Sequence, residues 1–237
     1  MIKLVKTLYF YSLLGCLCTA CQSTNSEEQT TATTQQTKDT VSTKTASKAE
    51  PKTILFFGNS LTAGYGLEPS QAFPAIIQQK IDSAGWNYTV INSGLSGETT
   101  AGGKSRIGWV LRQKVDVFVL ELGGNDGLRG VELESTRNNL QAIIDTVRAK
   151  NPDVKIILAG MQIPPNMGPD YTSKFRTIYP ELAEKNNLPL IPFLLEGVGG
   201  IARLNLPDGI HPTAEGHQLV AANVWKVLAP ILQEQNS

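Results

Sequence analysis

Short apolar runs alternate with amphipathic helical patterns from residue 53 onward, and this alternation limits the possible folds more than any other feature. The run TILFFG at residues 53–58 is almost continuously apolar, which is typical of a strand buried on both faces of a parallel sheet. Parallel strands need long crossover connections, and a helical pattern separates each run from the next. The sequence therefore predicts an α/β fold, a three-layer α/β/α sandwich around a five-stranded parallel sheet.

The alternation also places the individual elements. Strands are expected at residues 53–58, 88–92, 115–122, 154–160 and 188–193. Helices are expected at residues 71–84 (preceded by Ser70 and closed by Gly85), 104–114, 135–150, about 172–186 and 212–232. In parallel sheets of this kind, ligands bind beyond the carboxyl ends of the strands. Polar motifs that follow strands are therefore the candidates for a functional site.

The first such motif is Gly58-Asn59-Ser60-Leu61, directly after the first expected strand. A serine on a tight turn after a buried strand exposes its hydroxyl where reactions take place. The segment is not the G-x-S-x-G nucleophile elbow. Taken alone, it favours the simpler interpretation of a turn serine that caps a helix.

A serine nucleophile needs a base, and the chain contains only two histidines, His211 and His217. His211 lies in the segment DGIHP, three residues after Asp208. A turn at Gly209 would let the Asp208 carboxylate bond one ring nitrogen and leave the other for Ser60, which is the arrangement of a nucleophile, base and orienting acid. His217 falls inside the last expected helix, and we expect it to be a surface or partly packed residue.

Two further loops offer hydrogen-bond donors for a developing oxyanion. Gly97 follows the second expected strand, and a glycine lets a backbone N–H approach a substrate closely. Asn125, in the segment GGND after the third strand, offers a side-chain amide. Such donors each contribute roughly 3–4 kcal/mol to catalysis in serine hydrolases.

These motifs, GNSL, Gly97, GGND and DGIHP in this order, resemble the four blocks of the SGNH (GDSL-type) hydrolases, and most closely their bacterial thioesterase I, lysophospholipase and arylesterase group. The resemblance extends over residues 54–232. It implies a flavodoxin-like fold, Ser60 as nucleophile, His211 as base and Asp208 as its orienting acid. It also implies an oxyanion hole made of the Ser60 and Gly97 N–H groups and the Asn125 side chain, with no metal or cofactor.

One position departs from this family. The usual G-D-S has become Gly58-Asn59-Ser60, so the side chain before the serine is neutral. Asn keeps an acceptor oxygen and tolerates turn conformations, and Asn59→Asp is therefore expected to keep or raise turnover.

A second motif, at residues 102–105 (GGKS), looks like the end of a phosphate-binding loop. The first glycine that such a loop requires is replaced by Glu98, whose charge would repel phosphate, so no nucleotide is expected. The chain also has 21 basic and 21 acidic residues, a balance that argues against a nucleic-acid partner.

The first fifty residues differ in character from the rest. Residues 1–21 have a basic start, an apolar stretch and small residues before a cysteine, and they resemble a bacterial lipoprotein signal lipidated at Cys21 or Cys16. A plain cleaved signal is the alternative. Residues 22–50 are rich in Ser and Thr and contain no aromatic residue, Leu, Ile or Met, which predicts a disordered linker. The folded domain is then residues 51–237, exported and anchored to the membrane, facing the periplasm or the cell exterior.

The predicted reaction is hydrolysis of carboxylic esters or thioesters through an acyl-enzyme on Ser60. Expected substrates are aryl and short-chain esters, lysophospholipids and acyl thioesters. Residues 161–175 form a loop rich in Met, Pro and aromatic residues, which either walls an acyl groove or packs on the surface. A carbohydrate or peptidoglycan O-acetyl esterase of the same superfamily and a non-catalytic acyl-binding lipoprotein are the alternatives. The oligomeric state is left open.

Overall fold

The structure, a computed structural model, describes residues 50–235. The predicted signal and all but the last residue of the predicted linker therefore lie outside the described part of the chain. Within that part, no helix is both long enough and apolar enough to span a membrane.

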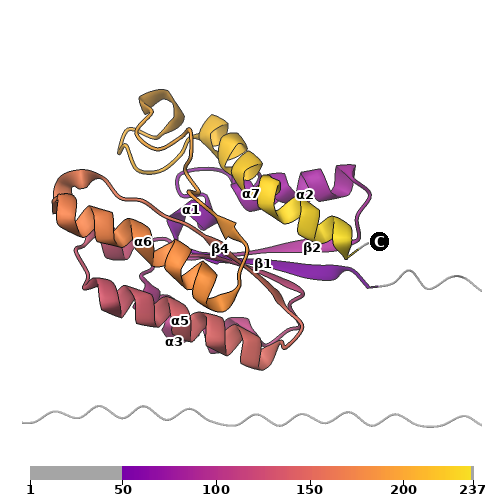
Figure 1. Ribbon diagram of the computed structural model, residues 1–237. Helices are drawn as coiled ribbons and strands as arrows, with labels where there is room; N and C mark the ends of the chain where they lie inside the picture. The colour runs from indigo at the N-terminus through magenta and orange to yellow at the C-terminus, as the bar shows by residue number, and fades with distance from the viewer. Residues whose placement is uncertain (1–49, 236–237) are drawn as a thin grey trace, which may run out of the picture. The chain divides into compact units, whose positions relative to one another are not determined.

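The strands form one parallel sheet in the order β2-β1-β3-β4-β5 (Figure 1). Their bounds are Lys52–Gly58 for β1, Tyr88–Gly94 for β2, Val117–Glu121 for β3, Lys155–Ala159 for β4 and Leu190–Ile191 for β5. The central strands are buried on both faces: Ile54, Leu55, Phe56 and Phe57 of β1 are fully enclosed, and every residue of β3 is buried. The prediction of a five-stranded parallel α/β fold is confirmed.

Helices cover both faces of the sheet (Figure 1). The helices α2 (Phe73–Ser83) and α7 (Ala214–Glu234) pack together on one face. The other face carries α3 (Thr100–Val110), α5 (Leu133–Lys150) and α6 (Pro169–Asn186). Two short helices, α1 (Ser60–Ala63) and α4 (Gly124–Leu128), and three 3-10 turns, η1 (Pro69–Gln71), η2 (Pro165–Met167) and η3 (Ala202–Leu204), lie in the connections.

The predicted bounds differ from the observed ones by one to three residues at the ends of most elements, and two elements differ more. The last strand was expected over residues 188–193, but β5 contains only Leu190 and Ile191. Pro189 and Pro192 flank it, and a proline has no N–H to donate to a neighbouring strand. The helix expected from residue 104 begins four residues earlier, at Thr100, where the Thr99 side chain caps it.

The short β5 forms one edge of the sheet, and its flanking prolines leave little backbone free to pair with another chain.

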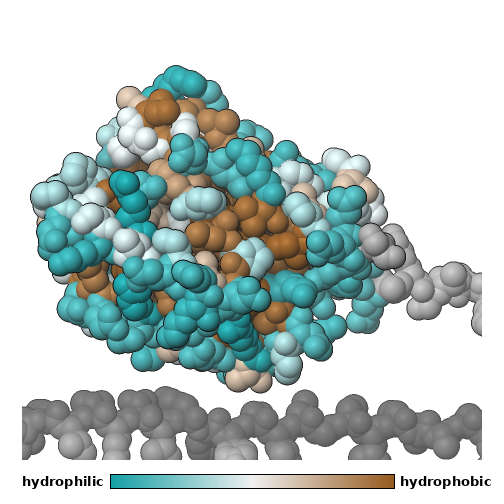
Figure 2. Space-filling view, in the orientation of Figure 1, coloured by the Kyte–Doolittle hydropathy of each residue, from teal (hydrophilic) through white to brown (hydrophobic). Residues whose placement is uncertain are grey.

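On the face seen in Figure 2, apolar residues gather in the middle of an otherwise mostly hydrophilic surface, between α6 and α7.

The two ends of the described chain meet at the amino ends of the strands. The Nζ of Lys52, the first residue of β1, donates a hydrogen bond to the carbonyl oxygen of Gln235 at 3.0 Å. Three of the motifs singled out in the sequence, GNSL, Gly97 and GGND, follow the opposite, carboxyl ends of β1, β2 and β3, and DGIHP lies between η3 and α7.

Candidate active site

Ser60 is the first residue of α1, immediately after β1 ends at Gly58. The residue that caps this short helix is Asn59: its Oδ1 accepts a hydrogen bond from the Leu61 N–H at 2.9 Å. Ser60 is therefore not needed as a cap, and its hydroxyl is free for another partner. The turn also needs Gly94 at the end of β2, because a Cβ there would lie 2.2 Å from the Ala63 nitrogen.

His211 brings its imidazole to this serine from 151 residues away in the chain. Its Nε2 lies 2.9 Å from the Ser60 Oγ, and its Nδ1 lies 2.7 Å from Oδ2 of Asp208. A carboxylate can only accept, so the Nδ1 carries the proton and the Nε2 is left to accept one from the serine hydroxyl. The structure thus brings together the three residues that the sequence singled out.

The loop that carries His211 and Asp208 is held by hydrogen bonds of its own. The Asp208 Oδ1 accepts from the backbone N–H groups of Ile210 and His211, at 2.9 and 3.0 Å, and Gly209 takes a left-handed φ of 70° between them. These backbone donors, above all that of His211, together with the His211 ring lower the pKa of Asp208 to about 2. Asp208 is therefore ionised throughout the neutral range and keeps the ring oriented.

Tyr65 covers one face of the His211 ring, with ring centroids 4.4 Å apart and planes tilted by 38°. Half of Tyr65 is exposed, so it forms part of the wall between the imidazole and water. No role for Tyr65 is predicted from the sequence, where its position shortly after Ser60 is the available signal.

Asn125 and Gly97, two of the predicted oxyanion donors, lie in the connections after β3 and β2, which are hydrogen-bonded to each other. Asn125 is in α4, and its Nδ2 donates one hydrogen bond to the Glu98 carbonyl oxygen at 3.0 Å. Gly97, the residue before Glu98, has a φ of 80°, and Arg129 donates to its carbonyl oxygen at 3.1 Å. Asn125 borders the same cavity as Ser60 and His211, whereas Gly97 is not among the residues that line it.

The cavity has a volume of about 440 Å³. Besides the polar residues above, most of its lining is apolar, including Met161, Ile163, Phe193, Leu195 and Ile210. Residues 161–165, the first part of the loop whose role the sequence left open, are in its wall. The later aromatic residues of that loop belong to α6 instead, where Phe175 is fully buried and Tyr171 bonds the Val131 carbonyl.

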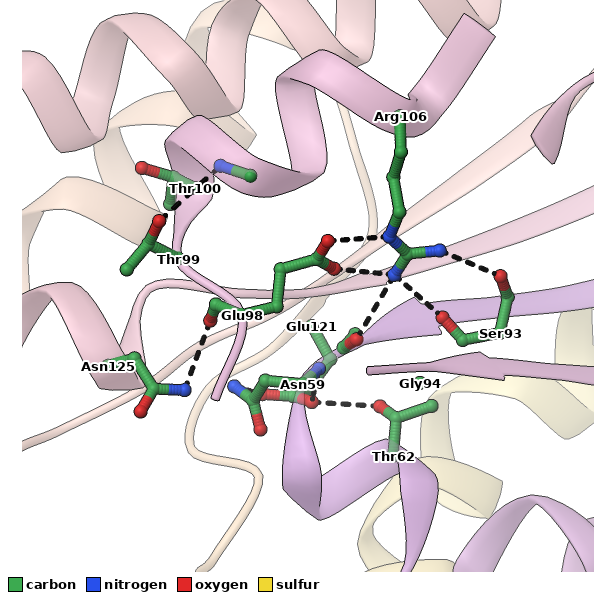
Figure 3. A network of polar contacts seen from close by, with 12 residues as sticks. Asn59, Thr62, Ser93, Gly94, Glu98, Thr99, Thr100, Arg106, Glu121 and Asn125 are labelled. Carbon is green, nitrogen blue, oxygen red and sulfur yellow. Dashed lines mark hydrogen bonds and ion pairs between the residues drawn. The ribbon is translucent and has the colours of Figure 1, made fainter. Parts of the chain in front are cut away.

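A polar network joins α3 and the loop of Glu98 to the carboxyl ends of β1, β2 and β3 (Figure 3). Its first part joins Arg106 of α3 to Glu98, whose side chain is almost completely buried, through two hydrogen bonds. The same guanidinium donates to the Oγ and carbonyl oxygen of Ser93 at the end of β2. Arg106 therefore links the loop of Gly97 and Glu98 to the carboxyl edge of the sheet.

The second part of the network surrounds Glu121, the last residue of β3, which is 1% exposed (Figure 3). Its carboxylate accepts from the Asn59 Nδ2 at 2.7 Å, the Asn59 N–H at 3.1 Å and the Thr62 Oγ1 at 2.8 Å. Burial raises its pKa to about 7, although these hydrogen bonds act in the opposite direction. Glu121 is not among the residues predicted from the sequence. An acidic residue inside the run VDVFVLEL was the available signal.

The prediction that His217 is a surface or partly packed residue is wrong, because its side chain is fully buried. Its Nδ1 accepts a hydrogen bond from the Phe73 N–H at 3.1 Å, and its ring stacks on that of Phe73. Ala72, which precedes α2, has no side-chain group to cap it, so His217 of α7 satisfies the first N–H of α2 in its place. Burial lowers the pKa of His217 to about 4, and the charge of His211 contributes less.

Residues 50–235 contain neither the phosphate-binding loop that residues 102–105 suggest nor a cluster of metal ligands. Residues 102–105 lie within α3 instead of forming a phosphate-binding loop. Among residues 50–235, no three His, Cys, Asp or Glu side chains lie close enough together to hold a metal ion.

Comparisons with known proteins, by sequence and by structure, point to the same group of proteins as the motifs. The model of the GDSL-like Lipase/Acylhydrolase family matches residues 56–219. Esterase TesA of Pseudomonas aeruginosa is 39% identical over 186 residues, which cover 78% of this chain and 92% of that protein. Thioesterase 1/protease 1/lysophospholipase L1 of Escherichia coli is 36% identical over 189 residues, covering 79% and 88%. A crystal structure of TesA superposes with a TM-score of 0.72 at 39% identity, covering 76% of this chain and 99% of that one.

Proposed function

Because the chain belongs to the GDSL-like lipase/acylhydrolase (SGNH) family, we propose that Ser60 is its nucleophile, His211 its base and Asp208 the acid that orients the base. The membership makes the protein a hydrolase of ester bonds, as its sequence predicts. The observation that supports the residue roles is the continuous chain of contacts from Asp208 through His211 to Ser60, with lengths of 2.7 and 2.9 Å.

In the proposed mechanism, the Ser60 Oγ attacks the substrate carbonyl carbon while its proton passes to the His211 Nε2. The tetrahedral intermediate then collapses, and His211 gives the proton to the departing alcohol or thiol. Water, activated by the same imidazole, attacks the acyl-enzyme and releases the acid. Asp208 stays ionised throughout and stabilises the imidazolium, which its low pKa permits.

The oxyanion would be held by the N–H groups of Ser60 and Gly97 and by the Asn125 side chain. Asn125 supports this role with its position: one of its two N–H bonds is used by the Glu98 carbonyl, and the side chain borders the cavity. The Glu98 contact fixes the orientation of the amide before substrate binds, which avoids reorganisation during the reaction.

The substrate's acyl chain would occupy the cavity beside Ser60. Its largely apolar lining suits a hydrocarbon chain, and a volume of about 440 Å³ has room for a short chain or for the part of a longer chain next to the ester bond. We therefore infer that the substrates are carboxylic esters or thioesters with an acyl group of this kind, lysophospholipids among them. The names of the E. coli and P. aeruginosa relatives are consistent with this range.

A fluorophosphonate probe tests the nucleophile directly. Wild-type protein should be labelled and lose esterase activity, and Ser60→Ala should show neither labelling nor turnover. Ser83→Ala is the matched control, because this exposed serine bonds only the Gln79 carbonyl at the end of α2 and should label like wild type. Full labelling of Ser60→Ala would refute the assignment.

The substrate class is tested by comparing kcat/KM for p-nitrophenyl butyrate, lysophosphatidylcholine and palmitoyl-CoA, with acetate release from acetylated xylan measured alongside. We expect the butyrate ester and lysophosphatidylcholine to be hydrolysed most efficiently. Acetate release as the most efficient reaction would instead favour the O-acetyl esterase alternative.

We also propose that the protein is exported and lipidated near its N-terminus, at Cys21 or Cys16. Support comes from the sequence of residues 1–21 alone, since these residues lie outside the described range. Metabolic labelling with a palmitate analogue should mark the wild type, and the label should disappear in either Cys21→Ser or Cys16→Ser. Retention of the label in both single variants and in the double variant would contradict the proposal.

A further inference from the structure

Asn59 stands where the motif that names the family has an aspartic acid, and the structure shows what the amide does there. Its two polar atoms point in opposite directions. The Oδ1 accepts from the Leu61 N–H at 2.9 Å and lies 3.4 Å from the Ser60 Oγ, whereas the Nδ2 donates to Glu121 at 2.7 Å. Asn59 is 2% exposed, so these protein groups satisfy its side chain.

Glu121 receives only donors from this part of the chain. The Asn59 backbone N–H, the Asn59 side-chain N–H and the Thr62 hydroxyl all point to its two oxygens. Gly58 makes this close approach possible, because a Cβ there would lie 2.5 Å from Oε2 of Glu121 and 2.1 Å from Oγ1 of Thr62. The arrangement is thus complementary to an ionised carboxylate.

We propose that Asn59 and Glu121 form a buried positioning pair for Ser60, and that the Asn59 amide keeps this pair intact at alkaline pH, where an aspartic acid in its place would lose its hydrogen bond to Glu121. This inference rests on the proposed function, because it concerns the placement of the proposed nucleophile.

Asparagine and aspartate at position 59 differ in their hydrogen-bonding groups: asparagine has an N–H donor where aspartate has a second acceptor oxygen. An aspartate at position 59 would keep one oxygen on the Leu61 N–H and place the other against Oε1 of Glu121. Two buried carboxylates in direct contact must share a proton. When this proton is lost, the repulsion between the two negative charges pushes the side chains apart or destabilises their contact strongly. The asparagine N–H does not titrate, so its bond to Glu121 persists when Glu121 is ionised.

Asn59 transmits the state of this pair to Ser60 through the backbone. It is the cap of α1, and Ser60 is the first residue of that helix. If the bond to Glu121 is lost, the Asn59 side chain is free to turn, and its hold on the Leu61 N–H weakens. The Ser60 hydroxyl and N–H would then move relative to the His211 Nε2 and to Asn125.

Other charged or titratable groups approach the pair from the packed helices. Arg106 of α3 reaches the Gly58 carbonyl oxygen at 3.4 Å, and its charge is already paired with Glu98. The Tyr179 hydroxyl of α6 donates to the Leu122 carbonyl oxygen at 2.9 Å, and burial raises the pKa of this tyrosine well above its usual value. Neither group makes a hydrogen bond to Glu121 or to the Asn59 side chain in the described structure.

The pH profile of kcat for p-nitrophenyl butyrate between pH 6 and pH 10 tests the proposal in four proteins: wild type, Asn59→Asp, Glu121→Gln and the double variant Asn59→Asp/Glu121→Gln. At pH 6, where the carboxyl pair still holds its proton, Asn59→Asp should have at least the kcat of wild type, as the sequence predicts. The ratio of its kcat to that of wild type should then fall by about tenfold up to pH 10, as the pair loses its proton. In Glu121→Gln, the new side-chain N–H would face an N–H of Asn59, so two donors meet and one hydrogen bond is lost. The kcat of this variant should be about tenfold below that of wild type at every pH.

The double variant exchanges the amide and the carboxylate, and so restores a complementary pair. It should have a higher kcat than Glu121→Gln and a ratio to wild type that does not change with pH. A constant ratio for Asn59→Asp from pH 6 to pH 10 would overturn the proposal, and so would a double variant no better than Glu121→Gln.

Thermal unfolding of the same four proteins, in the same buffers, separates positioning from simple stability. If Asn59→Asp becomes less stable as the pH rises while the kcat ratio of the folded enzyme stays constant, the pair does not position Ser60 and the inference fails. Fluorophosphonate labelling of wild type reports on the proposed function independently. A wild-type protein that is not labelled at Ser60 refutes that function, whatever the variants show.

Discussion

Asp208 accepts three hydrogen bonds in the candidate site, two from the backbone and one from the His211 ring. Replacing its carboxylate by an amide in Asp208→Asn would stabilise the wrong tautomer of the imidazole. We expect kcat to fall by about 10³- to 10⁴-fold with little change in KM, as for the corresponding change in serine proteases.

Steady-state kinetics with p-nitrophenyl butyrate measures this effect, and Asp153→Asn, a change at an exposed residue between α5 and β4, serves as the control. A loss of less than tenfold in Asp208→Asn would mean that the ring is oriented by something other than this carboxylate.

Asn125 is expected to act mainly on the transition state. In Asn125→Ala the proposed donor to the oxyanion is lost, together with the bond to the Glu98 carbonyl oxygen. Loss of one such donor costs about 10²- to 10³-fold in kcat. KM should remain within about threefold of wild type, since the ground-state carbonyl gains little from the donor. Equal losses in kcat and in substrate affinity would instead indicate a collapsed cavity.

Much of the candidate site could be predicted at the scale of residues. The segment DGIHP contains one of only two histidines in the chain, together with an acid at a suitable distance, and Ser60 follows a buried strand. Glu121 could not be assigned in this way, because its role depends on the register that pairs it with Gly58 across two strands far apart in sequence. The burial of His217 was missed for a similar reason, since its partner Phe73 lies 144 residues away.

At the scale of elements, Arg106 connects α3, β2 and the loop of Glu98. Arg106→Ala would leave the Glu98 carboxylate buried without its partner. Breaking a buried ion pair in this way costs about 3–5 kcal/mol of the free energy of unfolding. Because the same loop contains Gly97, kcat should also fall.

Urea unfolding measures the first effect. Arg112→Ala is the matched control: it removes an arginine from the turn just after α3 that is exposed and lies over the Trp109 ring, so the change in stability should stay below about 1 kcal/mol. If Arg106→Ala and Arg112→Ala had similar free energies of unfolding, the ion pair of Arg106 and Glu98 would not stabilise the fold as predicted.

His217 joins α7 to the start of α2, and its buried ring is expected to make this junction sensitive to acid. Its pKa of about 4 in the folded protein lies below the ordinary value of 6.5, so the folded state favours the neutral ring. The stabilising contribution is therefore complete above about pH 6.5 and is lost as the pH falls toward 4. A shift of this size corresponds to about 3 kcal/mol.

The variant His217→Gln keeps an acceptor for the Phe73 N–H but does not titrate in this range. We expect its free energy of unfolding, measured by urea at pH 7 and pH 4.5, to fall less with acid than that of wild type. The comparison is needed because Glu121 acts in the opposite sense: its raised pKa destabilises the fold as the pH rises from about 4.5 to 7. An identical acid dependence in both proteins would contradict the prediction.

The elements themselves were predictable where apolar periodicity is long, and not where glycine and proline override it. The start of α3 was placed late because glycines at 102 and 103 are poor helix formers. Gly103 is required there by packing, since a Cβ would lie 2.4 Å from the Leu122 side chain. The helices α1 and α4 have only four and five residues, too few for any periodic signal.

At the scale of the whole molecule, the change in composition predicts that the folded domain begins at residue 51. A chain that starts at Glu50 should therefore fold and hydrolyse esters by itself. Its thermal midpoint should lie within about 2 °C of that of the longer protein, and its kcat/KM should be unchanged. A clear loss of either quantity would mean that residues before position 50 contribute to the domain.

The contact between Lys52 and Gln235 has a practical consequence for handling this enzyme. Residues 50 and 235 lie at the amino ends of the strands, and the cavity beside Ser60 lies at their carboxyl ends, so a resin, label or fusion partner attached directly at either of these two residues should leave the cavity unobstructed. The same proximity means that a short peptide could close the chain into a ring, and new ends could then be opened in an exposed connection without cutting the sheet.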